Sequence, residues 1–259
     1  MPLDTDTVNQ LAARLLQAAT DRRAGPPLSD DHPGLTEADA YAIQAGLLRL
    51  KGGTRAGYKL GFTSAAMRQQ MGVDHPNSGV LLADMRLEDA RLPAGTLIHP
   101  RVEPEIAIQL GSDLSGAAVT TEQVAVATAA VLPAIEVVDS RYRDYRFKSV
   151  DNIADNSSAA RYVLGAPRAL ADLGDLGQVA VRLQIDGVLV DEGRADAALG
   201  SPLRAVAWLV THLNQSGEGL RAGEVVLTGG LTWAHALPAG HTVTAQFDGG
   251  LGAVVLRHR

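Results

Sequence analysis

Three glutamates lie in apolar segments of the kind that form β-strands. Glu103 and Glu105 are two positions apart, so a strand directs both side chains to one face. Glu136 lies within the apolar run 132–138 (LPAIEVV). Buried carboxylates without partners are unfavourable, so three that converge would require a cation, and oxygen ligands suit Mg²⁺ or Mn²⁺. The alternative is that these acids face solvent from an edge strand.

A lysine between two glycines is the second chemical candidate. Lys59 lies in the segment 57–64 (GYKLGFTS), flanked by Tyr58 and Leu60. A buried lysine in this setting could hold a negative group or carry a proton. The alternative is a surface lysine whose ammonium reaches water along its own side chain.

Three further segments could recognise an anion. The run 139–148 (DSRYRDYRFK) interleaves bases with aromatics, which indicates either an anion-recognising loop or a solvated face. The turn 154–158 (ADNSS) offers short polar side chains, and the glycine turn 228–232 (TGGLT) offers backbone N–H groups. The glycine turn lacks the lysine and spacing of a P-loop, and no G-x-S-x-G nucleophile motif occurs.

The elements that must position these residues change character along the chain. Apolar residues at helical spacing predict a helix over 8–19, and Thr36 begins a second one that ends before Gly52. From Tyr58 onward, short apolar runs alternate with turns, and Asp-Gly within 185–188 predicts a hairpin. The predicted strands include 79–83, 96–98, 103–110, 134–138, 179–185, 224–227 and 243–247, and two further helices are predicted over 122–131 and 202–213.

These patterns predict an α+β protein with a small helical N-terminal region over 1–78 and a β-rich catalytic domain over 79–259. The chain has 259 residues and a formal net charge of −6, without the basic stripe of a nucleic-acid binder. Cysteine is absent, which excludes disulfides and thiolate chemistry. No apolar run is long enough to span a membrane, and the first 25 residues do not resemble a signal peptide. We therefore expect a cytoplasmic protein that binds neither nucleic acid nor membrane.

Six segments, in order, resemble the 2-keto-4-pentenoate hydratase / 4-oxalocrotonate decarboxylase family, within the fumarylacetoacetate hydrolase superfamily. The resemblance implies a mixed β-roll, like the C-terminal domain of fumarylacetoacetate hydrolase, curled around a metal pocket. It extends from about residue 36 to the C-terminus. The segments are GYKLGFTS (57–64), MGVDHP (71–76), HPRVEPEIAI (99–108), PAIEVVDSR (133–141), ADNSS (154–158) and LTGGLT (227–232).

The resemblance also implies the functional residues. Glu103, Glu105 and Glu136 match three acidic ligands of one Mg²⁺ or Mn²⁺ ion, and Lys59 matches the family's active-site lysine. We expect five residues to contact a 2-oxo acid substrate, with an arginine at one of two positions reading a distal carboxylate. For either arginine, a structural salt bridge is the alternative. These five residues are Leu60, Arg141, Ser157, Arg161 and Thr232.

The family contains two reactions, and the sequence favours one of them. The segment 140–147 (SRYRDYRF) and the motif ending at Arg161 resemble the decarboxylases. Family hydratases carry an acid in P-D-F-G where this chain reads Pro76-Asn77-Ser78-Gly79, although the decarboxylases' P-I-Y-G differs as well. We therefore predict a lyase of aromatic meta-cleavage catabolism that converts a 2-oxo-enedioate, such as 2-oxo-3-hexenedioate, to 2-hydroxypenta-2,4-dienoate and CO2.

Two alternatives and two partner predictions remain. The main alternative is a hydratase that adds water to 2-hydroxypenta-2,4-dienoate and yields 4-hydroxy-2-oxopentanoate. An inactive partner subunit is a minor one. The resemblance further implies a homo-oligomer and a complex with a companion enzyme of the same pathway.

Overall fold

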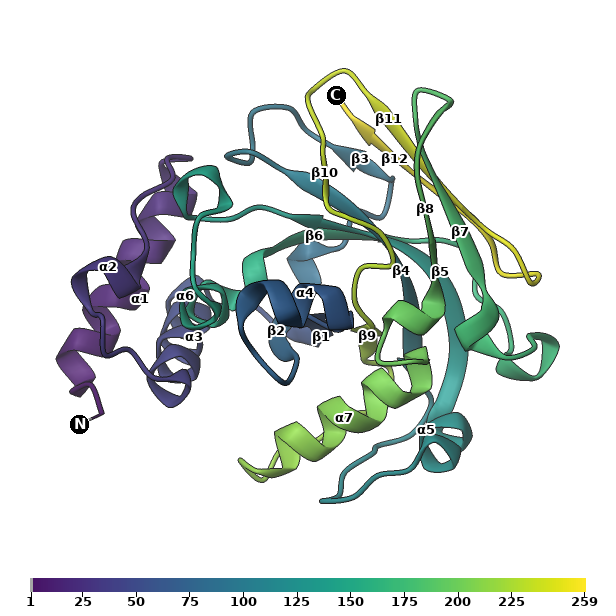
Figure 1. Ribbon diagram of the computed structural model, residues 1–259, viewed down its shortest axis with the longest axis horizontal. Coiled ribbons are helices and arrows are strands. Elements are labelled where there is room, and N and C mark those ends of the chain that lie inside the picture. Colours follow the sequence, from purple (N-terminus) through teal and green to yellow (C-terminus); the bar gives the residue numbers. More distant parts are fainter. Residues whose placement is uncertain (1) are drawn as a thin grey trace.

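The computed structural model describes residues 2–259, as an α+β fold in which N-terminal helices flank a curled, half-barrel sheet (Figure 1). Helix α1 (Thr5–Thr20) and helix α3 (Glu37–Lys51) pack against each other, with the short α2 (Leu28–Asp31) between them in sequence. Asp4 caps α1 by accepting from Thr7 N–H, and Thr36 and Asp39 form a capping box on α3. Both N-terminal helices are thus confirmed.

The large sheet contains the strands that carry the predicted site. Its strand order is β2-β1-β9-β4-β5-β6, and β10 pairs with β4. The two longest strands, β4 and β5, run antiparallel at its centre and are almost entirely buried, which matches the nearly unbroken apolar sequence of β5. The strands are β1 (Arg55–Gly61), β2 (Asn77–Leu82), β4 (Arg101–Leu110), β5 (Thr128–Val138), β6 (Ala159–Leu164), β9 (Val225–Leu227) and β10 (His235–Ala236).

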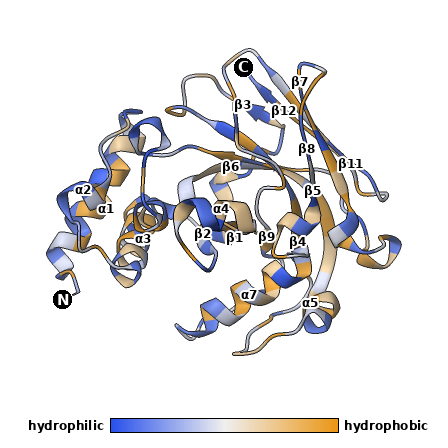
Figure 2. Cartoon of the chain, viewed as in Figure 1, coloured by the Kyte–Doolittle hydropathy of each residue, from blue (hydrophilic) through white to orange (hydrophobic). Residues whose placement is uncertain are grey.

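A second sheet packs against β5 and completes the main core. Its order is β3-β12-β11-β7-β8. Asp186 and Gly187 take left-handed backbone conformations in the β7–β8 turn, which confirms the predicted hairpin. Figure 2 shows α7 (Pro202–Asn214) as an amphipathic helix, and its apolar residues join this core. The strands are β3 (Arg91–Leu92), β7 (Ala180–Ile185), β8 (Val188–Arg194), β11 (Thr242–Phe247) and β12 (Gly252–His258).

One predicted helix is shorter than expected, and one predicted strand does not form. The helix expected over 122–131 ends as α5 (Thr121–Ala127), and the chain continues directly into β5, where Val131 pairs with Ile108 of β4. The pairing of β5 with β4 therefore overrides the local helical pattern. The strand expected over 96–98 does not form, because the Asp139 carboxylate accepts the backbone N–H groups of Ile98 and His99 instead.

The N-terminal helices form an apolar cluster of their own, which includes residues of α6 (Ser149–Ala154). The predicted boundary at residue 78 falls inside the large sheet, since β1 and the start of β2 precede it. The short α4 (Ala65–Met71) connects these two strands. Within residues 2–259, no helix combines the length and hydrophobicity required to cross a membrane.

Candidate metal centre and substrate cavity

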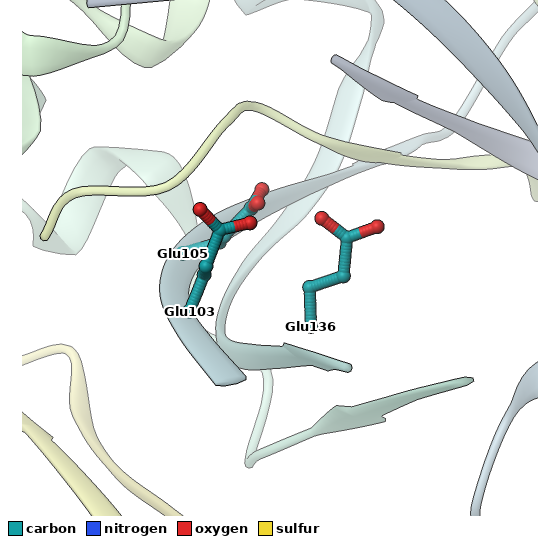
Figure 3. Close-up of side chains that lie close together, drawn as sticks. All are labelled: Glu103, Glu105 and Glu136. Carbon is teal, nitrogen blue, oxygen red and sulfur yellow. The ribbon is translucent and has the colours of Figure 1, made fainter. Parts of the chain in front are cut away.

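The three glutamates converge on one point of the large sheet. Glu103 of β4 lies directly opposite Glu136 of β5 in the strand register, and Glu105 projects from the same face of β4 as Glu103. One carboxylate oxygen from each lies within 4.8 Å of the others. Figure 3 shows the three carboxylates directed toward a common space. The structure therefore excludes the alternative of acids facing solvent from an edge strand.

The triad carries more negative charge than its protein neighbours can satisfy. Glu105 and Glu136 are 0% exposed. Glu105 Oε2 accepts the backbone N–H of Gly229 at 2.7 Å, but Glu105 Oε1 and Glu136 Oε1 have no polar partner within residues 2–259, and Glu136 Oε2 has only the Lys59 ammonium at 3.1 Å. Buried carboxylate oxygens without partners are strongly unfavourable, whereas a hard divalent cation accepts such oxygens as ligands. These orphaned oxygens fit an Mg²⁺ or Mn²⁺ ion.

Electrostatics leads to the same conclusion. Burial raises the pKa of Glu105 well above the ordinary value of 4.5, and the neighbouring Glu136 raises it further. Burial also raises the pKa of Glu103 to about 7, although Lys59 opposes that shift. Without a cation, the triad is therefore expected to take up protons at neutral pH. A divalent ion would remove this penalty.

We expect the stability of the metal-free protein to fall as pH rises. The folded chain holds protons on Glu103 and Glu105 that the unfolded chain has already released, so stability is lost between the unfolded pKa of 4.5 and the folded pKa of about 7 for Glu103. Calorimetry in EDTA at about pH 5 and about pH 8 should show this fall, and Mg²⁺ should raise Tm more at the higher pH. An equal Mg²⁺ effect at both values would contradict the metal site.

Lys59 is held between the triad and the turn that follows α6. Its side chain is buried, and Nζ donates to the Ser157 carbonyl at 3.0 Å. Nζ also lies 3.1 Å from Glu136 Oε2 in an ion pair. Burial lowers the pKa of Lys59, but the carboxylates of Glu136, Glu103 and Glu105 together raise it above its ordinary value. The group is thus an ammonium ion at neutral pH, and the surface-lysine alternative is excluded.

The two glycines that flank Lys59 permit this close packing. A Cβ on Gly57 would lie 1.8 Å from the Val225 carbonyl oxygen on the adjacent strand β9. A Cβ on Gly61 would lie 2.4 Å from Asn77 Oδ1 and 2.6 Å from Ser157 Oγ. Only glycine allows the backbone to approach these groups so closely.

A cavity of about 300 Å³ opens beside Lys59 and Glu103. Three of the five predicted substrate contacts, Leu60, Ser157 and Thr232, are on its wall. Their role in binding stays a prediction. The wall also contains residues that the sequence did not indicate as contacts, among them Met67, Met71, Arg101, Tyr145, Phe147 and Trp233.

The two arginines predicted to read a distal carboxylate are not on the cavity wall. Arg141 is buried, and its guanidinium pairs with the Asp155 carboxylate and donates to the Asp139 carbonyl. Arg161 of β6 donates to the Ala160 carbonyl at 2.7 Å. Asp155 is fully buried and requires a counter-charge, which Arg141 supplies. For Arg141, the structure therefore shows the structural salt bridge that was the alternative to a substrate contact.

Arg101 is the arginine that reaches the cavity. Its guanidinium lies 4.0 Å from the centroid of the Tyr145 ring, and it has no ion-pair partner within residues 2–259. The Tyr145 hydroxyl lies within 3.1 Å of the His99 and Val138 carbonyl oxygens, which fixes the ring. The signal was present in the sequence, since Arg101 precedes Glu103 by two positions and lies on the same face of β4.

Comparisons with known proteins agree with this geometry. Residues 71–257 match the family described as fumarylacetoacetate (FAA) hydrolase C-terminal. The chain is 43% identical to the 2-keto-4-pentenoate hydratase of Burkholderia vietnamiensis, over 97% of both chains. It is 36% identical to the 4-oxalocrotonate decarboxylase of Pseudomonas sp. strain CF600, over 95% of both. The structure of 4-oxalocrotonate decarboxylase from Pseudomonas putida G7, complexed with magnesium and adipate, superposes with a TM-score of 0.94 at 33% identity over 98% of both chains.

Proposed function

The chain belongs to the fumarylacetoacetate hydrolase family, and we propose that it is a divalent-metal-dependent hydratase that adds water to a 2-hydroxy-2,4-dienoate such as 2-hydroxypenta-2,4-dienoate. At a coarser level, it is a metal-dependent lyase of the hydratase and decarboxylase type that acts in meta-cleavage catabolism. The sequence favoured the decarboxylase. The hydratases among its relatives, at higher identity, support the alternative better.

The charge of the cavity is the observation that carries the proposal. The triad supplies three negative charges, while Lys59 and Arg101 supply two positive ones. With a divalent cation, the site would hold one net positive charge. This matches a substrate with a single carboxylate, whereas a diacid would leave one carboxylate without a counter-charge.

The remaining wall suits a short hydrocarbon chain. Met67, Met71, Phe147 and Trp233 supply apolar surface beside the charged end. Hydration requires that the enol oxygen lose its proton and C5 gain one, after which the oxygen of water bonds to C4 and its proton goes to C3. An apolar wall around the diene carbons excludes all but the reacting water.

The chain's own groups would hold the substrate at its oxygens. Glu103, Glu105 and Glu136 would bind the cation, which when present supplies a Lewis acid toward the carboxylate and the adjacent 2-oxygen of the substrate. The Lys59 ammonium lies beside Glu136 and is placed to donate to negative charge on that oxygen. Arg101 would bind the carboxylate as a charge-assisted partner.

The proposal is tested by comparing two substrates with Mg²⁺ present. We expect kcat/KM for water addition to 2-hydroxypenta-2,4-dienoate to exceed kcat/KM for CO2 release from 2-oxo-3-hexenedioate. The first reaction is followed by loss of dienoate absorbance and the second by CO2. Faster CO2 release would contradict the hydratase and favour the decarboxylase.

We expect Arg101→Gln to act on substrate binding. A hydrogen bond to a charged group contributes about 1.5–3 kcal/mol, so KM should rise roughly tenfold to a hundredfold, with kcat changed less. The measurement is steady-state kinetics on the preferred substrate. Arg143→Gln is the matched control, since Arg143 is exposed and is not on the cavity wall. An unchanged KM in the Arg101 variant would remove the arginine from substrate binding.

Decarboxylation of a 2-oxo-enedioate is the second candidate, and Asn77 supports it. An amide at this position cannot take a proton from water, whereas the family's hydratases carry an acid there. Homo-oligomer formation, a complex with a companion enzyme and a cytoplasmic location all stay predictions.

A further inference from the structure

A chain of buried polar side chains runs from Asn77, behind the cavity wall, to Ser157 and Lys59 on the wall itself. Asn77 begins β2 opposite Gly61 of β1 and is 1% exposed. Its Nδ2 donates to Asn152 Oδ1 at 2.9 Å, and its Oδ1 accepts from Ser157 Oγ at 2.9 Å. Ser157 Oγ in turn accepts from Lys59 Nζ at 3.4 Å. Asn77 is not on the cavity wall, so it acts on the site only through these neighbours.

The direction of each hydrogen bond follows from its neighbours. A serine hydroxyl has one proton, and Asn77 Oδ1 at 2.9 Å is a closer acceptor for it than Asn152 Oδ1 at 3.4 Å. The lone pairs of Ser157 Oγ therefore face Lys59, which can only donate. At the other end, Asn152 Nδ2 donates to Ser158 Oγ at 3.1 Å, so Asn152 must present its oxygen to Asn77.

The backbone of the turn 156–158 is strained, and such strain is typical of functional sites. Asn156, Ser157 and Ser158 have φ values of 51°, 52° and 58°, in the left-handed region that non-glycine residues rarely adopt. The Asn156 side chain anchors the turn to β2 by accepting from Val80 N–H at 2.7 Å and donating to the Val80 carbonyl at 2.9 Å. This conformation directs the Ser157 carbonyl at Lys59 Nζ.

We propose that Asn77 is a positioning residue that fixes the Ser157 hydroxyl as an acceptor toward Lys59. The ammonium is then held by two hydrogen-bond acceptors, the Ser157 carbonyl and Ser157 Oγ, and by the ion pair with Glu136 Oε2. The longest of these contacts is the one to Ser157 Oγ, so it is the contact that a substrate oxygen can most easily replace. The inference rests on the proposed function only in requiring that Lys59 act on the substrate, and it applies equally to hydration and decarboxylation.

The identity of residue 77 gives the sharpest test. An aspartate has the shape of asparagine, but its second oxygen would face Asn152 Oδ1 at the 2.9 Å now occupied by a hydrogen bond. We therefore expect Asn77→Asp to lower kcat. The alternative is that position 77 matters only because asparagine cannot act as a general base. In that case Asn77→Asp would raise kcat.

The Asn77–Ser157 coupling is measured with a double-mutant cycle. We expect Asn77→Ala and Ser157→Ala each to lower kcat about fivefold to tenfold, the value of one lost hydrogen bond, with KM and the Kd for Mg²⁺ within about twofold of wild type. The double variant should be no slower than either single variant. Ser78→Ala is the control, because Ser78 is buried in the same strand and makes no hydrogen bond to Asn77, Ser157 or Lys59.

Additive losses in the double variant, or a higher kcat in Asn77→Asp, would overturn the proposal. If Asn77→Ala failed to fold, as judged by Tm, Asn77→Asp and Ser157→Ala would still decide it. The cycle is run on whichever of the two acids the wild-type protein turns over. A failure of the positioning proposal is therefore distinct from a failure of the hydratase proposal, because the comparison of the two substrates tests the latter.

Discussion

We expect Glu105→Gln to lower kcat about a thousandfold and to abolish Mg²⁺ binding, since stabilisation of charge by a bound cation contributes several kcal/mol to the reaction. Glutamine keeps the shape of the side chain, and its Oε1 can still accept the Gly229 N–H that Glu105 accepts at 2.7 Å. The substitution removes the charge and leaves an amide nitrogen, which does not ligate a hard cation. The fold should therefore survive while the site loses its metal.

Titration calorimetry of Mg²⁺ into chelator-treated protein measures this effect, with kcat determined in parallel. Glu122→Gln is the matched control, because Glu122 is exposed in the first turn of α5 and is not one of the three clustered carboxylates. Wild-type and Glu122→Gln proteins should bind Mg²⁺ alike. Retention of both Mg²⁺ affinity and activity by the Glu105 variant would rule out the triad as the metal site.

Lys59→Met is expected to lower kcat by about a hundredfold to ten-thousandfold, the range for a positioned proton-transfer or charge-stabilising group. Methionine fills a similar volume without a charge. The three carboxylates remain, so Mg²⁺ should bind at least as tightly as in wild type, because a nearby positive charge has been removed. The variant thus separates metal binding from catalysis.

The conservative substitution sharpens this prediction. Lys59→Arg keeps the charge, but a planar guanidinium does not fit the buried space between the Ser157 carbonyl and Glu136 Oε2, so kcat should not recover. Calorimetry for Mg²⁺ and steady-state kinetics are measured on both variants. If kcat of Lys59→Met stayed within about fivefold of wild type, Lys59 would serve only as a counter-charge for the triad and not in catalysis.

The convergence of the three glutamates was predictable in part because its signal is local. Glu103 and Glu105 share a face of any strand that contains them, and Glu136 lies in a second apolar strand. What the residues alone did not fix is the register that places Glu103 opposite Glu136, since strand pairing depends on contacts distant in sequence. The family resemblance supplied that step.

The rest of the site depends on contacts between distant segments. Asn77 and Ser157 meet only because β1 and β2 pack beside the turn after α6, and a turn-like sequence such as ADNSS does not reveal its partner. For Arg141 the sequence left a substrate contact and a structural salt bridge open, because nothing local indicated that Asp155 would bind its guanidinium. One of the two expected readers of a second carboxylate is thereby committed elsewhere, and the other, Arg161, is not on the cavity wall, which weakens the decarboxylase prediction.

The central claim is that one divalent cation on the glutamate triad enables the lyase reaction, and a titration of activity with Mg²⁺ tests it most directly. Chelator-treated protein is mixed with 2-hydroxypenta-2,4-dienoate, and loss of the dienoate is followed as Mg²⁺ is added. The account predicts no turnover without the ion, and activity that rises in proportion to bound Mg²⁺ and saturates at one ion per chain. Undiminished turnover in the fully chelated protein would contradict it.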